Sequence, residues 1–370
     1  MDDWNYCVTT LPKVSRTFAL NISVLKGDLH KSILVAYLFC RTIDTVEDAC
    51  QLEASHKIKL LLHFASILKN TKNNSAALDQ WIKNTSVVDG SPADIDLLKN
   101  TRRVFNIFES LQESHKQHIV SSVCTMAQGM AYFQKKIDLG KITLLEDAAE
   151  LEEYCYFVAG AVGEMLCNLF INEMPGLPTQ NKKEMKKNAI SFGLGLQITN
   201  ISKDIVVDRG RGWSYVPRTY IEANGLTPDE FYSGKSTEND LKVLKSLLKK
   251  TVGHLNDALS FILAIPRSYA RIRLFCIWPL WMAMETVAEL HNNHDLLKSN
   301  ANVKISRDTV KRILRLTPFI CWSNNLLQRS FSNILKTEEF DSFDHFNIEQ
   351  LKKRLNGLSL DNIPSKPQAD

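Results

Sequence analysis

Apolar residues recur at the spacing of one helix face along nearly every long segment of this chain. The alternation of apolar and polar residues that is typical of half-buried strands is almost absent. Glycine (15) and proline (11) are sparse and fall mainly between the periodic segments, where they end helices. The pattern predicts an all-α fold of about ten or more helices. We expect a single domain over residues 1–370, with a core at about 10–335 and a disordered tail at about 360–370.

Two acidic clusters interrupt this helical sequence about 160 residues apart. In the first, Asp44 and Asp48 are four residues apart, with Glu47 between them. In the second, the polar residues follow one another at intervals of four: Asn200, Asp204 and Asp208. On a helix this spacing places the side chains on one face, one turn above the next.

Carboxylates stacked in this way repel each other, and burying them without a cation is costly. A few hard oxygen ligands, with room left for waters and phosphates, suit magnesium better than zinc or calcium. We therefore expect two magnesium-binding clusters, made by Asp44, Glu47, Asp48, Asn200, Asp204 and Asp208.

Three residues around the first cluster have both a chemical and a structural interpretation. Tyr37 and Arg41 share the helix face of the cluster, but Arg41 could simply neutralise Asp44 or Asp48. Arg16 follows a serine of the kind that starts helices, and it could hold a phosphate or be an ordinary surface arginine. Residues 51–115 we expect to be surface helices and connectors, to which we attach no chemistry.

The second half of the chain leaves similar alternatives open. Tyr154 is either a core tyrosine or a cavity residue, and nearby Gly160 and Gly163 permit either close helix packing or room for a large apolar ligand. Arg209 and Arg211 directly follow the second cluster. They could close over a diphosphate or simply favour the dipole at a helix C-terminus.

Composition excludes several classes of function. The net charge of +4 and the pI near 8.5 are too mild to indicate nucleic-acid binding. Eight scattered cysteines without a CxxC pair indicate reduced core thiols and neither a disulfide framework nor a zinc site. The N-terminus lacks signal-peptide features, and no run of uncharged apolar residues is long enough to span a membrane. We expect a cytoplasmic protein.

Together these features indicate a ligand with a polyphosphate head and a long hydrocarbon body. Magnesium and cationic side chains would neutralise a leaving diphosphate, so that an allylic carbon–oxygen bond can ionise. A dry, aromatic-lined cavity would then protect the carbocation from water. Tyr37 and Tyr154 could stabilise positive charge through their ring faces or relay a proton.

Four motifs, in this order, resemble those of the squalene/phytoene synthases, the head-to-head class of isoprenoid synthases. They are Ser15 to Phe18, Tyr37 to Asp48, Tyr154 to Gly160, and Gln197 to Asp208. The resemblance covers about residues 10–290 and implies the α-helical isoprenoid-synthase fold around one large central cavity. It also implies coupling of two prenyl diphosphates, here expected to be farnesyl diphosphate, to presqualene diphosphate, which then ionises and rearranges.

The resemblance implies roles for individual residues. The two magnesium clusters match the metal sites of the family, and Tyr37, Tyr154 and Arg41 match its catalytic region. The residues expected to bind substrate are Ser15, Arg16, Phe18, Gln197, Asn200, Lys203 and Arg211. Family members often have Asp-x-x-Glu-Asp at the second cluster, whereas Val207 stands at the glutamate position here.

The expected product is squalene, which requires a hydride from NADPH in the second step. The segment around Lys304 and Arg307 resembles the basic segment that contacts this cofactor in squalene synthases. Alternatives are a dehydrosqualene or phytoene synthase without reduction, a terpene cyclase that uses one prenyl diphosphate, and a non-catalytic helical assembly factor. Eukaryotic squalene synthases carry a C-terminal membrane anchor, and we expect this chain to lack one and to contact membranes peripherally when it releases product.

Overall fold

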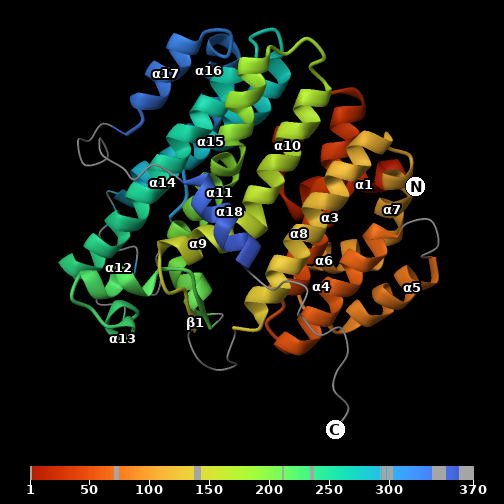
Figure 1. Cartoon of the computed structure of the whole chain (residues 1–370), viewed down its shortest axis with the longest axis horizontal. Helices are drawn as coiled ribbons and strands as arrows, with labels where there is room; N and C mark the ends of the chain where they lie inside the picture. The colour runs from red at the N-terminus through yellow and green to blue at the C-terminus, as the bar shows by residue number, and fades with distance from the viewer. Residues whose placement is uncertain are drawn as a thin grey trace. The chain divides into compact units, whose positions relative to one another are not determined.

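The computed structural model describes residues 2–70, 75–136, 143–210, 212–233, 237–291, 293, 297, 303–335 and 347–357. These residues form eighteen α-helices and a single pair of two-residue strands, so the all-α prediction is confirmed (Figure 1). The chain forms two compact units, of which the first comprises Met1–Leu139, Glu164–Pro175 and Asn356–Asp370 and the second Gly140–Gly163 and Gly176–Leu355. The single domain over 1–370 stays a prediction, and the tail at 360–370 lies outside the described residues.

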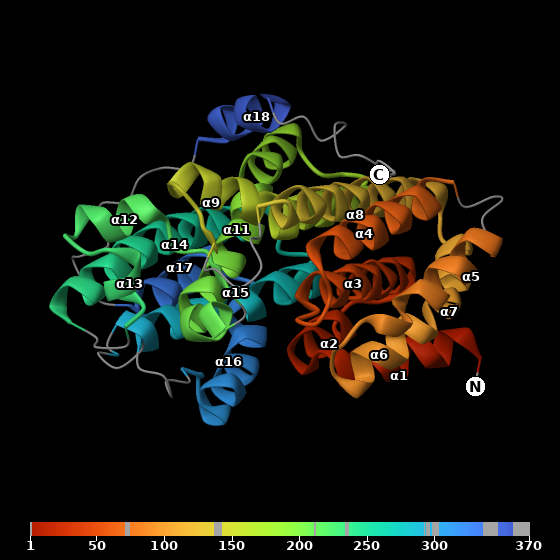
Figure 2. The ribbon, with the colours of Figure 1, turned by 90° about the horizontal axis from the view of Figure 1, so that it is seen from below.

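The first unit is built around α3 (Gly27–Asp48), which contacts six other helices of the unit (Figure 2). The remaining elements of this unit are α1 (Asp3–Val14), α2 (Arg16–Ser23), α4 (Ala54–Lys69), α5 (Ser75–Asn84), the 3₁₀ turn η2 (Thr85–Val87), α6 (Pro92–Lys99), α7 (Thr101–Glu109) and α8 (Glu113–Gln134). Ser15 ends α1 and caps α2, where its Oγ accepts a hydrogen bond from the backbone N–H of Phe18 (3.2 Å). The helix start predicted at Ser15 is therefore confirmed.

An aromatic cluster sets the rotation of α3 about its axis. The ring of Phe39 lies 4.8–5.7 Å, centroid to centroid, from those of Phe64, Phe105 and Phe108. Because Phe39 points into this core, the face of α3 that carries the first acidic cluster is left partly accessible. The expectation that 51–115 lies at the surface was wrong, since three of these four aromatic residues come from that segment.

The second unit is built around α11 (Thr179–Gly210), which contacts α9 and packs most extensively on α14 (Figure 1). Its other elements are β1 (Thr143–Leu144), α9 (Ala148–Cys155), the π-helical turn η3 (Tyr156–Gly160), β2 (Trp213–Ser214), α12 (Arg218–Ala223), α13 (Pro228–Phe231), α14 (Glu238–Ala264), α15 (Ala270–His291), α16 (Arg307–Ile320), α17 (Asn324–Ser332) and most of α18 (Ile348–Gly357). The helix α10 (Ala161–Asn172) begins in this unit and ends in the first. The two strands are parallel and pair Thr143 with Trp213.

Glycines allow α11 to touch the backbone of the η3–α10 segment. A Cβ at Gly163 would lie 2.1 Å from the carbonyl oxygen of Ala189, and one at Gly193 would lie 2.2 Å from that of Ala159. No side chain fits at such distances. Of the two roles considered for the glycines of this segment, the structure shows close helix packing.

One helix in the described part of the chain is long and apolar enough to cross a membrane. It runs over Ala148–Asn172, and 61% of its most apolar stretch is buried within the protein. Seven of the eight cysteines are buried and only Cys50 is exposed, which confirms that the cysteines mostly lie in the core.

Candidate active site

The first acidic cluster occupies the C-terminal end of α3. Asp44 and Glu47 are partly buried, while Asp48 is exposed. Burial and, to a smaller extent, the charge of Asp48 together raise the pKa of Asp44 to about 7. Burial and the charges of the neighbouring aspartates likewise raise the pKa of Glu47 to about 8. The raised pKa values mean that the protein neighbours do not fully compensate the negative charge that Asp44 and Glu47 carry once they ionise, as expected for carboxylates that bind a cation.

The guanidinium of Arg41 is paired with a carboxylate outside the cluster. Its Nε donates to Oδ1 of Asp94 (2.7 Å), and its terminal Nη2 donates to Oδ2 of Asp94 (2.8 Å). Asp94 is buried in the first turn of α6 and also accepts a hydrogen bond from the hydroxyl of Ser91 (2.7 Å). The idea that Arg41 mainly neutralises Asp44 or Asp48 is thus wrong, because its bidentate partner is Asp94.

Lys57 on α4 supplies a second cation beside the first cluster. Its Nζ donates to the backbone carbonyl of Glu47 (2.6 Å). Burial lowers the pKa of Lys57, and the nearby carboxylate of Glu47 opposes that shift. Neither Lys57 nor Asp94 was identified from the sequence. Each of them lies on another helix and comes close to the cluster only in the folded chain, so no regular spacing in the sequence could have indicated it.

Tyr37 lies one turn before Arg41, against the start of α2. Its ring is 5.0 Å, centroid to centroid, from that of Phe18, and Ser15 hydrogen-bonds to its hydroxyl. Burial raises the pKa of Tyr37 to about 12 despite that hydrogen bond, so the phenol is protonated at neutral pH. The first unit thus brings Ser15, Phe18 and Tyr37 together, whereas Arg16 is exposed.

The second cluster lies on the accessible face of α11. Ile198, Ile201 and Ile205 on the same helix are buried. Asn200 is exposed, and the half-exposed Asp204 forms an ion pair with Lys203 (Nζ to Oδ2, 3.2 Å). Gln197 is partly exposed one turn before Asn200. The helical spacing predicted for these residues is therefore present.

At the end of α11, Arg209 lies over the ring of Tyr232, with its Cζ 5.7 Å from the ring centroid. Burial raises the pKa of Tyr232, and the charge of Asp208 adds to this shift. Val207, at the position that is often a glutamate in the family that this sequence resembles, is half exposed. Arg211 lies outside the described residues.

Tyr154 belongs to an aromatic group in the second unit. It is buried, its ring stacks on that of Tyr215 at 4.5 Å, and its hydroxyl donates to the Tyr215 hydroxyl (2.9 Å). Trp213 lies edge-on to Tyr215 at 5.2 Å. The π-helical turn η3 begins at Tyr156, two residues after Tyr154, and such turns are frequent at functional sites. Tyr215 and Trp213 were not predicted from the sequence.

The two residues expected to bind the reduced cofactor lie at the start of α16. Lys304 precedes the helix, Arg307 is its first residue, and both are exposed. Their side chains are thus accessible to a ligand from solvent. A role in binding NADPH stays a prediction.

The donors of each acidic cluster suit a magnesium ion that is shared with a phosphate ligand. Among the described residues, no group of three or more His, Cys, Asp or Glu side chains encloses a metal position. Magnesium is commonly held by one or two carboxylates together with waters and substrate phosphates. The carboxylates on α3, with the raised pKa of Asp44 and Glu47, fit that mode of binding.

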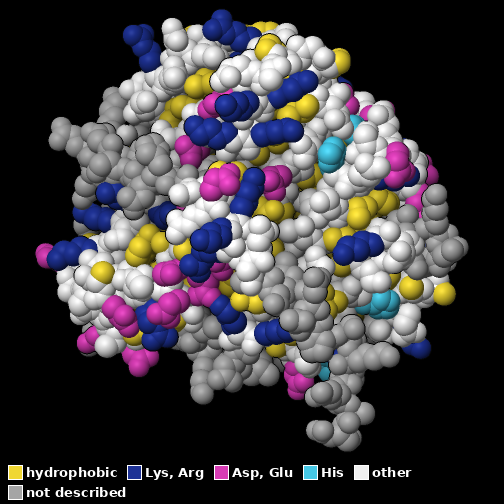
Figure 3. All heavy atoms as spheres, in the orientation of Figure 1, with side chains coloured by type: hydrophobic (Ala, Val, Ile, Leu, Met, Phe, Trp, Pro, Cys, Tyr) yellow, Lys and Arg dark blue, Asp and Glu magenta, His cyan; other side chains and the backbone are white. Residues whose placement is uncertain are grey.

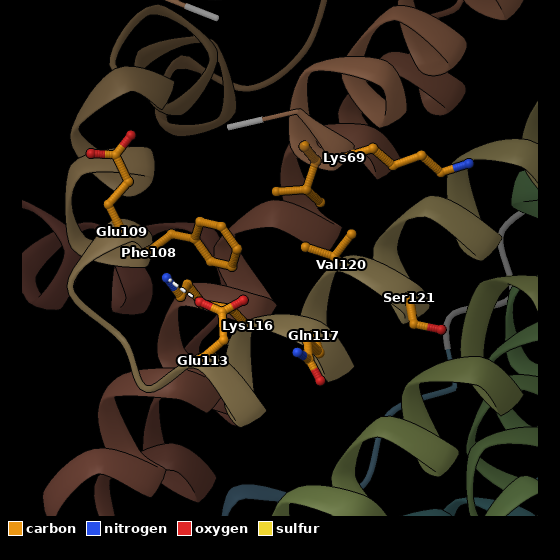
Figure 4. A pocket seen from close by; sticks show the side chains of 9 residues that line it. Lys69, Phe108, Glu109, Glu113, Lys116, Gln117, Val120 and Ser121 are labelled. Atoms are coloured by element: carbon orange, nitrogen blue, oxygen red, sulfur yellow. Dashed lines mark ion pairs between the residues drawn. The ribbon is translucent and has the colours of Figure 1, made fainter. Parts of the chain in front are cut away.

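The first unit also has a pocket of about 640 Å³, which is lined by other residues than those of the predicted site (Figure 4). Its walls include Leu68, Phe108 and Val120, together with the ion pair between Glu113 and Lys116 (2.7 Å). No predicted site residue lines this pocket. It therefore contributes nothing to the candidate site.

Comparison with known proteins identifies the family. The family model for squalene/phytoene synthases matches residues 11–309. The chain belongs to the squalene/phytoene synthase family. All four motifs that carried the resemblance lie within the matched residues, as do both acidic clusters.

Known members of the family are similar over most of this chain. The squalene synthase of Candida albicans is 30% identical over 318 residues, which cover 83% of this chain and 66% of that protein. The squalene synthase of Mus musculus is 28% identical over 299 residues, with 80% and 66% coverage. The chain thus spans slightly less than two thirds of the length of these two relatives.

Solved structures share the fold. The structure of TcSQS in complex with the ligand BPH1237 has a TM-score of 0.75 at 24% identity and covers 94% of this chain and 96% of its own. A dehydrosqualene synthase in complex with a ligand has a TM-score of 0.57 at 21% identity, with coverage of 85% and 95%. The helical fold predicted from the sequence is therefore that of this family.

Proposed function

We propose that this protein is a squalene synthase, which couples two molecules of farnesyl diphosphate head to head through presqualene diphosphate. The observation that carries this proposal is the pair of intact acidic clusters, each on one helix face within the residues that match the family. The two sequence relatives described above, each similar over about four fifths of this chain, are squalene synthases, which favours squalene over an unreduced product.

The residues of the first unit would bind one end of a substrate. Asp44 and Asp48, with Glu47 beside them, would hold magnesium, which when bound neutralises the charge of a leaving diphosphate. Arg41 keeps a fixed orientation through Asp94 and is positioned to attract phosphate oxygens. Arg16 and Ser15 would contact the same group. Because the hydroxyl of Tyr37 stays protonated, it would donate a hydrogen bond, while its ring face would attract a carbocation.

The residues of the second unit would bind a second diphosphate. Asn200, Asp204 and Asp208 would hold magnesium, and Lys203 and Arg211 would add positive charge close to the phosphates. Gln197, one turn before Asn200 on α11, would also contact the substrate. Tyr154 is held rigidly by Tyr215, and their stacked rings would exclude water and stabilise positive charge on the substrate.

The second step would require NADPH, and Lys304 and Arg307 would bind its phosphates. Both side chains are exposed and cationic, as a phosphate contact requires. The cofactor supplies a hydride that ends the rearrangement of the carbocation.

Product analysis tests this proposal. Purified protein is incubated with farnesyl diphosphate and magnesium, with and without NADPH, and the organic extract is analysed by mass spectrometry. We expect squalene only when NADPH is present. A fifteen-carbon cyclic product would instead identify a terpene cyclase, and dehydrosqualene in both reactions would identify a synthase without reduction.

A further inference from the structure

Exposed apolar side chains are concentrated at the junction of α16 and α17. Eight large hydrophobic residues are exposed in the described part of the chain, and half of them lie within residues 316–326. These four are Leu316 (55% exposed), Phe319 (80%), Trp322 (53%) and Leu326 (46%). We call this group the α16–α17 ridge. So dense a group of exposed apolar residues usually marks an interaction surface.

The outward face of α16 combines these apolar residues with cations. Arg312, Arg315, Leu316 and Phe319 follow one another at i, i+3, i+4 and i+7, which places them on one side of the helix. Ile313 and Thr317 are buried on the side that faces the protein. On the face of the molecule that Figure 3 shows, basic, acidic and hydrophobic side chains lie interspersed.

The exposure of the ridge does not come from loose attachment of the two helices. The indole N–H of Trp278 donates to the hydroxyl of Thr317 (2.9 Å), and that of Trp281 donates to Ser330 (3.0 Å). The buried guanidinium of Arg273 donates to Asn324 (2.8 Å). Three polar anchors from α15 therefore fix α16 and α17, and their outward apolar side chains are presented to solvent by a rigid support.

The chain segment that carries the ridge has basic side chains and no acidic ones. Residues 311–335 contain four basic residues, Lys311, Arg312, Arg315 and Arg329, and no acidic one. Arg312 pairs with Glu285 (2.7 Å) and Lys311 with Asp308 (3.3 Å). Arg315 and Arg329 are exposed and form no ion pair with any residue that the structure describes. These two guanidinium groups are available for anions outside the protein.

We propose that the α16–α17 ridge docks on the surface of an anionic lipid bilayer. Phe319, Trp322 and the two leucines would enter the boundary between headgroups and acyl chains, where tryptophan is favoured. Arg315 and Arg329 would reach lipid phosphates from the rim. A second copy of the chain is a poorer partner, because a symmetric contact would bring like-charged arginines together. The inference stands on this surface and does not depend on the chemistry proposed above.

Vesicle sedimentation with the full chain tests the proposal. Wild-type protein is mixed with vesicles of phosphatidylcholine, alone or with phosphatidylserine. We expect binding to the anionic vesicles that weakens as salt is added. The double substitution F319S/W322S should reduce binding roughly tenfold or more, since it removes the two largest inserted side chains. R315Q/R329Q should abolish the preference for phosphatidylserine.

Val87→Ser provides the matched control, because Val87 is equally exposed but lies on η2, in the other unit. Circular dichroism and thermal melting of each variant check that the fold is kept. The proposal is overturned if the wild type does not bind anionic vesicles, or if F319S/W322S binds them as well as Val87→Ser does. A wild-type dimer that F319S/W322S dissociates, without vesicle binding, would assign the ridge to a protein interface instead.

Discussion

Arg41 and Asp94 form a bidentate ion pair that joins α3 to α6, with nitrogen–oxygen distances of 2.7 and 2.8 Å. The two residues are 53 positions apart, and Asp94 is buried while Arg41 is only partly so. The pair holds the arginine in one orientation beside the first cluster. The hydrogen bonds from Arg41 to Asp94 raise the pKa of Arg41, and the charge of Asp44 adds to this shift. Asp94 is thus a positioning residue for Arg41.

Asp94→Asn should weaken both stability and turnover. The amide cannot accept both guanidinium hydrogen bonds, and we expect a loss of about 2 kcal/mol in the free energy of unfolding. A double-mutant cycle with Arg41→Gln, measured by urea unfolding, should show that most of this loss is shared by the two residues. Asp79→Asn removes an exposed partner of Arg102 and should cost much less. Equal losses for the two variants would show that the Arg41–Asp94 pair has no special role.

Asp44→Asn or Asp204→Asn should abolish metal-dependent ligand binding with little effect on the fold. Magnesium and inorganic diphosphate together should raise the melting temperature of the wild type, because a ligand that binds only the folded state stabilises it. The increase should vanish in either variant. Glu109→Gln, on an exposed position of α7, should retain it. A full increase in the aspartate variants would show that these carboxylates do not bind the metal.

Turnover should fall with the same substitutions. Removing a metal-binding carboxylate should lower kcat/KM by about a hundredfold or more, since the transition state would lose several kcal/mol of charge stabilisation. Initial rates of diphosphate release from farnesyl diphosphate measure this directly. Wild-type rates for Asp48→Asn or Asp204→Asn would contradict the assignment of either cluster.

The glycines between α11 and the η3–α10 segment should tolerate no side chain. Gly163→Ala would place a Cβ 2.1 Å from a carbonyl oxygen, and we expect it to destabilise the protein by about 3 kcal/mol or more. Gly176→Ala is the control, because no atom lies within 4 Å of a Cβ there. Calorimetric melting of both variants compares them. A stable Gly163→Ala variant would show that the two backbones are not in contact.

Glu152 should contribute stability that depends on pH. Burial alone would raise its pKa, but His254, with Nε2 at 3.5 Å, and Lys250 outweigh burial and lower the pKa. A carboxylate with a lowered pKa stabilises the folded state above its unfolded pKa of about 4.3, and this contribution disappears as the pH falls through the folded value.

The corresponding measurement compares wild type with Glu152→Gln by urea unfolding between pH 8 and pH 3. The difference in unfolding free energy should stay constant down to about pH 5 and shrink below about pH 4. A difference that grows as the pH falls would contradict the lowered pKa. A constant difference would show that Glu152 acts through packing alone.

The sequence was sufficient to predict the helical fold and the placement of each acidic cluster on one face of a helix. These features have local signals, because helical spacing alone places Asp44 with Asp48 and Asn200 with Asp204 on one face. Burial of Phe39 and Ile198 on the opposite sides of these helices agrees with that spacing.

The partners of these residues could not be predicted in the same way. Asp94 contacts Arg41, Lys57 contacts Glu47, and Tyr215 contacts Tyr154. These contacts form only when segments distant in the sequence pack together, and the periodicity of the sequence does not indicate them. Gly163 shows the same limit, since its sequence context was compatible with either a cavity or a close contact. Only the 2.1 Å approach to Ala189 decides between them.

The stoichiometry of the reaction with farnesyl diphosphate distinguishes head-to-head coupling from every single-substrate reaction. With magnesium and NADPH present, diphosphate and hydrocarbon are measured in the same samples over time. We predict that two diphosphates are released for each squalene formed, and that Asp44→Asn and Asp204→Asn both stop this release. One diphosphate per hydrocarbon product, or unchanged release by either variant, would contradict the proposed function.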